Sequence, residues 1–146
     1  MKVPVAYIHV RFSAHATEDL EKVKTAFYNL LPADGVDELT FKKTATKGHY
    51  GNPITLFEAR IKDKRLIEAF IKKISTNLSE SDREKIITGS NVFLERSDLY
   101  LRFDKQAAFQ GEFNLQRADP IHVRIHFTVR DERRIAEICR ELGLKP

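Results

Sequence analysis

"IHVRIHFT", residues 121–128, alternates strictly between apolar and polar side chains. Its apolar residues predict one buried side, and its polar residues predict a second side in water: His122, Arg124, His126 and Thr128. Such alternation is typical of a half-buried β-strand. A sheet built from strands of this kind has one face covered by helices and one face open to solvent.

Further strands and amphipathic helices flank this segment. Alternation predicts strands over 5–12, with Ala6 facing inward, and over 98–103. Two more strands, 38–46 and 54–61, surround a glycine turn and predict a hairpin. Apolar side chains at helical spacing predict helices after Thr17, Asp63 and Ser79 and within 131–144, plus a short helical turn at 104–111.

This order of elements predicts an α+β fold. It reads strand, helix, two strands, two helices, strand, helical turn, strand and helix. We expect a two-layer sandwich, with a mixed or antiparallel sheet and helices on one face. The length of 146 residues suits one hydrophobic core, so residues 1–146 are expected to form a single domain.

Composition favours a cytoplasmic globular protein. Hydrophobic residues make up 42% of the chain and charged residues 32%, as in soluble domains. No apolar run is long enough for a membrane span, and residues 1–12 lack the apolar core of a signal peptide. The single cysteine, Cys139, excludes an internal disulfide and a multi-cysteine metal site. We therefore expect no membrane association and no cofactor.

The positive charge is concentrated in one part of the chain. A net charge of +4 and a pI of about 9.2 permit nucleic-acid binding without demonstrating it. Between residues 42 and 65, only Glu58 and Asp63 oppose a larger set of cations, namely Lys42, Lys43, Lys47, Arg60, Lys62, Lys64 and Arg65.

The turn "KGHYGNP", residues 47–53, lies within this basic stretch. Glycines let backbone amides approach a phosphate, lysine neutralises it, and His49 and Tyr50 offer flat rings for unpaired bases. The segment 48–51 also reads G-x-x-G, a loop signature of one RNA-binding module. That loop joins two helices, whereas this one joins two expected strands, so the fold of the module does not transfer.

A second basic surface is expected on the open face of the sheet. His122, Arg124 and His126 project from the same side of one strand. Arg102 is a candidate for the same face, as are His9 and Arg11 if the first strand has a matching orientation.

Catalytic and metal-binding motifs are not evident. The chain contains no P-loop, no G-x-G-x-x-G and no G-x-S-x-G. His122 and His126 would lie roughly 13 Å apart on a strand, too far to share an ion. Asp104 next to Lys105 resembles a catalytic pair, but an aspartate after a strand is more often a helix cap.

Purely structural roles compete with each of these assignments. Hairpin lysines can serve only to prevent edge pairing, His49 can hold the turn, and Tyr50 can pack on the core. For the strand histidines the structural role has the stronger case. RNA binding gains weight because charge, glycine and aromatic residues cluster together.

Two strings resemble hallmark segments of an archaeal family described as predicted RNA-binding proteins or predicted exosome subunits. They are "KGHYGNPI", residues 47–54, and "LYLRFDKQAAFQGEF", residues 99–113, preceded by "HAT" at 15–17. The resemblance implies the fold of the ribosomal protein that binds 5S RNA, and it carries no catalytic residues. It singles out residues 48–53 together with Arg102, Asp104, Lys105 and Gln106. The segment after Phe113 departs from the familiar pattern.

The sequence thus predicts a non-catalytic RNA-binding protein, an accessory factor of archaeal RNA processing or degradation (exosome-associated) or of ribosomal RNA. The expected contacts are Lys42, Lys43, Lys47, Gly48, His49, Tyr50, Gly51, Arg60, Lys62, Arg102, Lys105 and Arg124. RNA is the expected partner, with exosome or ribosomal proteins and a second copy of the chain left open. The alternative is a protein-interaction module of an RNA-processing complex, marked by a large exposed apolar patch. A small hydrolase or nuclease is the least favoured interpretation.

Overall fold

A six-stranded antiparallel sheet forms one layer of the molecule, described here from a computed structural model. The described residues are 4–15, 18–31, 41–47, 51–88, 92–95, 98–116 and 120–144. The sheet order is β2-β3-β1-β6-β5-β4. The strands are β1 (Val5–His15), β2 (Phe41–Lys47), β3 (Pro53–Ile61), β4 (Val92–Glu95), β5 (Asp98–Phe103) and β6 (Ile121–Phe127).

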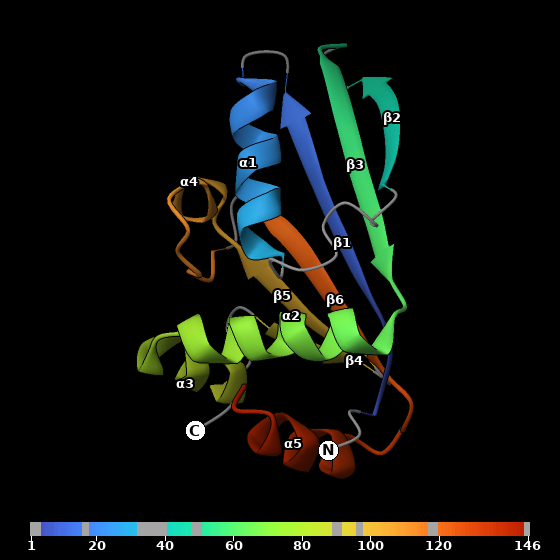
Figure 1. The fold of residues 1–146 in the computed structure, drawn as a ribbon, viewed down its shortest axis with the longest axis vertical. Coiled ribbons are helices and arrows are strands. Elements are labelled where there is room, and N and C mark those ends of the chain that lie inside the picture. Colours follow the sequence, from blue (N-terminus) through green and yellow to red (C-terminus); the bar gives the residue numbers. More distant parts are fainter. Residues whose placement is uncertain are drawn as a thin grey trace.

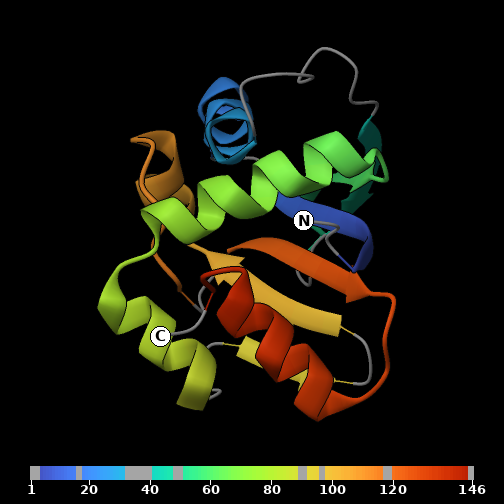
Figure 2. The ribbon, with the colours of Figure 1, turned by 60° about the horizontal axis from the view of Figure 1, so that its bottom comes forward.

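Helices form the second layer. They are α1 (Leu20–Leu30), α2 (Lys64–Asn77), α3 (Glu80–Thr88), α4 (Lys105–Phe109) and α5 (Glu132–Glu141). In Figure 1, α1 runs along β1 and α2 crosses in front of the sheet. Figure 2 shows α5 and α3 near the end of the molecule that holds β4. Within the described ranges, no helix is both long and apolar enough to span a lipid bilayer.

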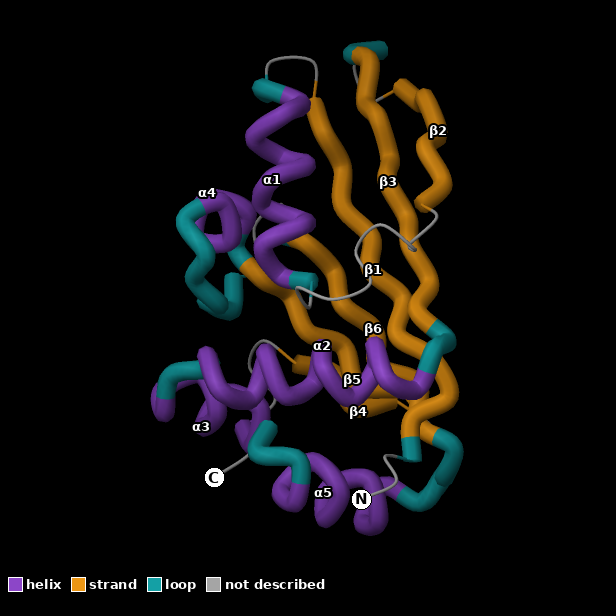
Figure 3. The backbone as a smooth tube through the Cα atoms, viewed as in Figure 1, coloured by secondary structure: helices purple, strands orange, loops and turns teal. Residues whose placement is uncertain are grey.

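The predicted α+β two-layer fold is confirmed, and most elements have the predicted type. Figure 3 shows how the strands and helices segregate into layers. The strand β4 was not predicted. The cap of α1 is Asp19, whose carboxylate accepts from the amide of Glu21, whereas Thr17 lies outside the described residues. Asp63 and Ser79 cap α2 and α3 as predicted.

Ala6 does not face the core, contrary to the prediction. The register between β1 and β6 shifts between Val5 and Tyr7, so that Ala6 is an extra residue in β1. Val5 is buried and Ala6 is exposed. A bulge of this kind reverses the inward and outward positions on one side of it, and strict alternation holds only from Tyr7 onward.

The core depends on the pairing of β1 with neighbours on both edges. Ile8 lies opposite Ile61 on β3 and opposite Ile125 on β6, and all three side chains are buried. Phe12 stacks on Phe57 with ring centroids 4.8 Å apart. These buried residues share the face covered by the helices, so the alternate residues of the same strands occupy the opposite face.

A buried lysine binds a backbone carbonyl at the part of β1 that β6 does not reach. The pairing with β6 reaches Arg11, whereas the pairing with β3 continues to His15. Lys105 of α4, only 8% exposed, donates to the carbonyl of Ser13 and lies 3.2 Å from Glu18 Oε1. A buried ammonium requires such partners, so this contact fixes α4 beside β1.

Replacing Lys105 with Met is expected to destabilise the protein by about 1–3 kcal/mol, because it removes the donor to Ser13 and the cation beside Glu18 while keeping an aliphatic stem. Urea unfolding monitored by circular dichroism measures the effect. Lys72→Met, at an exposed position on α2, is the control and should change stability by less than about 0.5 kcal/mol. Equal stability of the two variants would contradict the structural role of Lys105.

Candidate nucleic-acid interface

Basic and aromatic side chains share the face of the sheet opposite the helices. We call this surface the open face. Its strand register aligns three rows of side chains across the sheet. The rows are Lys42, Glu58, Arg11, His122 and Arg102; then Arg60, His9, Arg124 and Tyr100; then Tyr7, His126 and Asp98. Residues from five strands therefore meet on one surface.

A stack of rings and guanidinium groups lies within these rows. The Arg60 guanidinium carbon is 4.6 Å from the centroid of the Tyr7 ring. The Tyr7 ring stacks on the His126 imidazole, with centroids 4.7 Å apart and planes inclined by 20°. On the neighbouring strand pair, the guanidinium carbon of Arg124 on β6 lies 5.9 Å from the centroid of the Tyr100 ring on β5. These distances are those of cation–π and π-stacking contacts.

Asp98 fixes this arrangement from the first position of β5. Its carboxylate lies 2.5 Å from His126 Nδ1 and 3.0 Å from Arg124 Nη2. The Tyr100 hydroxyl is 3.5 Å from the same carboxylate. Burial acts to lower the pKa of Arg124, but the hydrogen bond and charge of Asp98 outweigh it and raise that pKa above its ordinary value. Asp98 thus orients an imidazole and a guanidinium at once.

His9 lies among three arginines of the open face, whose charges act on its imidazole. Burial lowers its pKa below the ordinary value of 6.5, Glu58 acts in the opposite direction, and the charges of Arg60, Arg11 and Arg124 lower it further. The imidazole is therefore mainly neutral at pH 7. A neutral imidazole has one donor nitrogen and one acceptor nitrogen, which suits hydrogen bonding to a base edge.

The structure separates the predicted contact residues into groups. Arg60, Arg102 and Arg124 lie together on the open face, and Lys42 borders them on β2. Lys47 is exposed at the end of the hairpin and Lys62 is exposed after β3. Gly51 has φ +79°, which favours glycine. Lys43 belongs to β2 opposite Phe57; Gly48, His49 and Tyr50 lie outside the described residues.

Lys105 does not extend the open face, contrary to the prediction. Its ammonium group is buried against Ser13 and Glu18 on the helical side of the sheet. Asp104 caps α4, with Oδ2 accepting from the amide of Ala107, in agreement with the helix-cap interpretation of its sequence. In the sequence, a lysine next to a strand end resembles a surface cation. In the structure, α4 begins at Lys105, and the ammonium group of this residue lies against the edge of β1.

Two aromatic residues of the site were missed. Tyr7 and Tyr100 were not among the predicted contacts, although both stack with arginines of the open face. The signal was present in the alternation, since Tyr7 has the same parity as His9, and Tyr100 has the same parity as Arg102. Outward aromatic residues on strands of the same sheet, here β1 and β5 on either side of β6, indicate a stacking surface rather than a core.

The arrangement is suited to binding a polyanion with exposed bases. Its arginines and lysines can neutralise phosphates, and its tyrosines and histidines present flat faces and hydrogen-bonding nitrogens. In the described part of the chain, no three His, Cys, Asp or Glu side chains are grouped closely enough to hold a metal ion.

Comparisons with known proteins agree with this chemistry. A family model described as RNA binding matches residues 7–127. An RNA-binding protein of Pyrococcus abyssi is 37% identical over 127 residues, which are 85% of this chain and 82% of that protein. The chain therefore belongs to this RNA-binding family, and the resemblance noted in its sequence is confirmed.

Solved structures from archaea share the whole fold. A protein of Archaeoglobus fulgidus from the family DUF54 has a TM-score of 0.79 and 31% identity, covering 94% of this chain and 99% of that one. A DUF54 protein of Methanothermobacter thermautotrophicus has a TM-score of 0.76 and 26% identity, covering 97% and 98%. The described sheet and its helices are thus the architecture of these archaeal proteins.

The free energy of unfolding is expected to fall as the pH falls below about 6.5 through the protonation of His9. The unfolded state takes up this proton at the ordinary pKa, whereas the folded state takes it up only at lower pH, so the unfolded state binds more protons in between. Urea unfolding of the wild type and of His9→Gln, between about pH 7.5 and about pH 5, isolates the contribution. A pH dependence that is identical in the two proteins would contradict it.

Proposed function

We propose, from its membership of the RNA-binding family matched over residues 7–127, that this chain binds RNA on the open face of its sheet. The observation that carries the proposal is the stack in which Tyr7 lies between the guanidinium of Arg60 and the ring of His126. Three strands contribute to this stack, and a fourth supplies Asp98, which orients His126.

The side chains of the open face divide into phosphate-binding and base-binding groups according to their chemistry. Arg11, Arg60, Arg102 and Lys42 line the rows as cations for phosphates. Tyr100 and the imidazole of His9 face unpaired bases, whereas Tyr7 lies between Arg60 and His126 and holds these two groups in line. Because stacking tolerates every base, the surface favours exposed or single-stranded nucleotides over the closed groove of a duplex.

The hairpin of β2 and β3 extends the same surface along the strand direction. Lys42 lies opposite Glu58 beside the open face, whereas Lys47 lies opposite Pro53 at the hairpin end. An RNA strand that follows β3 from Arg60 toward the turn passes Lys42 on the open face. It meets Lys47 only at the exposed hairpin end, because Lys47 starts from the other side of β2, as Lys43 does. Lys62, exposed beyond the other end of β3, is available to a longer RNA.

The finer assignment within this proposal is a non-catalytic accessory factor of cytoplasmic RNA processing or degradation, exosome-associated, or of ribosomal RNA. The archaeal sources of the relatives support an archaeal setting, and the sequence resemblance over residues 47–54 and 99–113 motivates the exosome and ribosomal roles. Crosslinking the protein to RNA in an archaeal cell and sequencing the bound RNA separates precursor and decay substrates from ribosomal RNA.

The protein-interaction alternative has less support. It predicts a broad exposed apolar patch, but among the side chains that the structure describes, the large hydrophobic ones that are exposed are Tyr28 and Phe109. The open face, by contrast, carries Lys42, Arg11, Arg60, Arg102 and Arg124, and this gathering of cations favours a polyanion as the partner.

Replacing Arg60 with Ala is expected to weaken RNA binding and to reduce the slope of log affinity against log salt by about one, because one phosphate contact is lost. Fluorescence anisotropy with a labelled single-stranded RNA and a labelled hairpin RNA, each across a salt series, measures both quantities. Arg134→Ala, at an exposed position on α5 paired with Glu137, is the control. Binding of wild-type affinity and slope by the Arg60 variant would remove the open face from the site.

The same assay with Lys47→Ala tests the hairpin. If RNA reaches the end of β2, the variant binds all sequences more weakly and its salt slope also falls by about one. A slope equal to that of the wild type would confine the interface to the centre of the sheet.

A further inference from the structure

A pocket of about 320 Å³ lies on the helical side of the sheet, between α1 and α4. Its volume is at the lower end of the range of about 300–1,000 Å³ found for small-molecule sites. It is separate from the open face, because Phe27 of α1 packs on Phe12 on the helical side of β1, and α4 lies beside α1 (Figure 1). None of its residues belongs to the RNA contacts proposed above, and Lys105 serves as a structural anchor.

One wall of the pocket is an aromatic ring that the core does not use. Phe109 is 40% exposed at the end of α4, and Lys22 Nζ lies 5.8 Å from the centroid of its ring. Val23 and Ala26 of α1 are buried and form the apolar part of the lining. An apolar slot next to an exposed phenyl ring suits a flat ligand that stacks on the ring.

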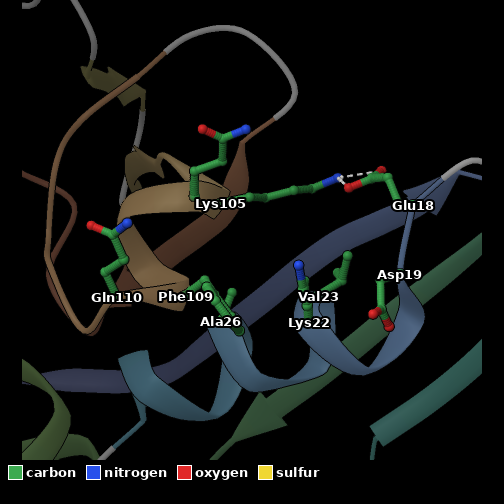
Figure 4. A pocket seen from close by; sticks show the side chains of 9 residues that line it. Glu18, Asp19, Lys22, Val23, Ala26, Lys105, Phe109 and Gln110 are labelled. Atoms are coloured by element: carbon green, nitrogen blue, oxygen red, sulfur yellow. Dashed lines mark hydrogen bonds and ion pairs between the residues drawn. The ribbon is translucent and has the colours of Figure 1, made fainter.

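The rim of the pocket is polar and of mixed charge. Gln106 and Gln110 contribute exposed side-chain amides. The ion pair of Lys105 with Glu18 crosses from α4 toward α1 and borders one side, as the dashed lines in Figure 4 show. Since Glu18 and Asp19 oppose Lys22 and Lys105, the site has no excess of positive charge for a phosphate. It suits a neutral ring with hydrogen-bonding edges.

We propose that this pocket binds a single unpaired nucleobase, stacked on Phe109 and hydrogen-bonded at its edge by the amides of Gln106 and Gln110. Glutamine amides pair in a bidentate manner with adenine, and adenine is therefore the first base to test. The source of the base is either a nucleotide turned out of an RNA on the open face, in which case the inference rests on the proposed function, or a free nucleoside.

The end of β1 connects the two surfaces. His15, the last residue of β1, has the same parity as Tyr7, His9 and Arg11 on the open face. Its imidazole Nε2 lies 3.9 Å from Glu18 Oε1, and its backbone amide donates to the same oxygen at 3.0 Å. Glu18 in turn lines the pocket. An RNA strand that runs along β1 past Arg11 therefore reaches the pocket rim at His15.

A single tryptophan provides the test, because the chain contains none. Phe109→Trp places a fluorescent ring in the wall of the pocket, and a base stacked on it quenches the emission. Tyr28→Trp is the matched control, since Tyr28 is also an exposed aromatic residue of this region, on α1, but does not line the pocket. Each variant is titrated with oligoadenylate, with adenosine and with inorganic phosphate, and RNA binding is followed in parallel by anisotropy.

Quenching of Phe109→Trp but not of Tyr28→Trp, by oligoadenylate or by adenosine and not by phosphate, supports the pocket. Quenching by the oligonucleotide alone identifies a base of bound RNA, and quenching by adenosine alone identifies a free nucleoside. If anisotropy shows RNA binding while neither probe quenches Phe109→Trp beyond the control, the pocket proposal is overturned and the open face stands. If RNA does not bind, the proposed function fails, and adenosine alone decides the pocket.

Phe109→Ala gives an independent measure. Loss of one base stack is expected to weaken binding of the quenching ligand about tenfold. The ligand competes with a fluorescent adenosine derivative in this assay, so no tryptophan is needed. Thr25→Ala, at an exposed position on α1 outside the pocket, should bind like the wild type. Equal affinity of the Phe109 and Thr25 variants would remove Phe109 from the site.

Discussion

The register of β1 is the constraint on which both faces of the sheet depend. β1 is paired along both edges, so the alternation of its side chains fixes the alternation of β3 and β6. Ile8 and Val10 enter the core, and His9 and Arg11 therefore emerge on the open face. A slip of β1 by one residue would bury His9 and Arg11 and expose Ile8 and Val10. The stability of the core thus maintains the geometry of the candidate interface.

Local patterns were sufficient to predict the fold class, because each pattern depends on neighbours in the chain. The alternation of β6 and the apolar stripe of α2 are visible within a few residues. The bulge at Ala6 and the strand β4 depend instead on pairing between distant segments. The burial of Lys105 has the same origin, since its partner Ser13 lies on a strand far away in sequence. No short window of sequence contains such information.

The candidate site was predicted in part for the same reason. Charge clusters along the sequence pointed to the hairpin, and outward parity identified Arg102, Arg124 and the histidines as one surface. The structure adds the register, which brings Arg60 of β3 next to Tyr7 of β1 and Asp98 of β5 next to His126 of β6. Which outward residues meet across strands follows from pairing order, and pairing order is a property of the whole sheet.

Asp98 explains how a basic surface remains ordered before it binds. Five cations gathered on one face repel one another, and a flexible arginine loses conformational freedom when a ligand immobilises it. The buried carboxylate of Asp98, between His126 and Arg124, offsets the repulsion and holds both groups in place. Its negative charge also opposes an incoming phosphate. Because Asp98 repels phosphates and the arginines attract them, the open face favours an RNA whose bases lie toward Asp98. The backbone of this RNA then lies toward Arg60, Arg11 and Arg102.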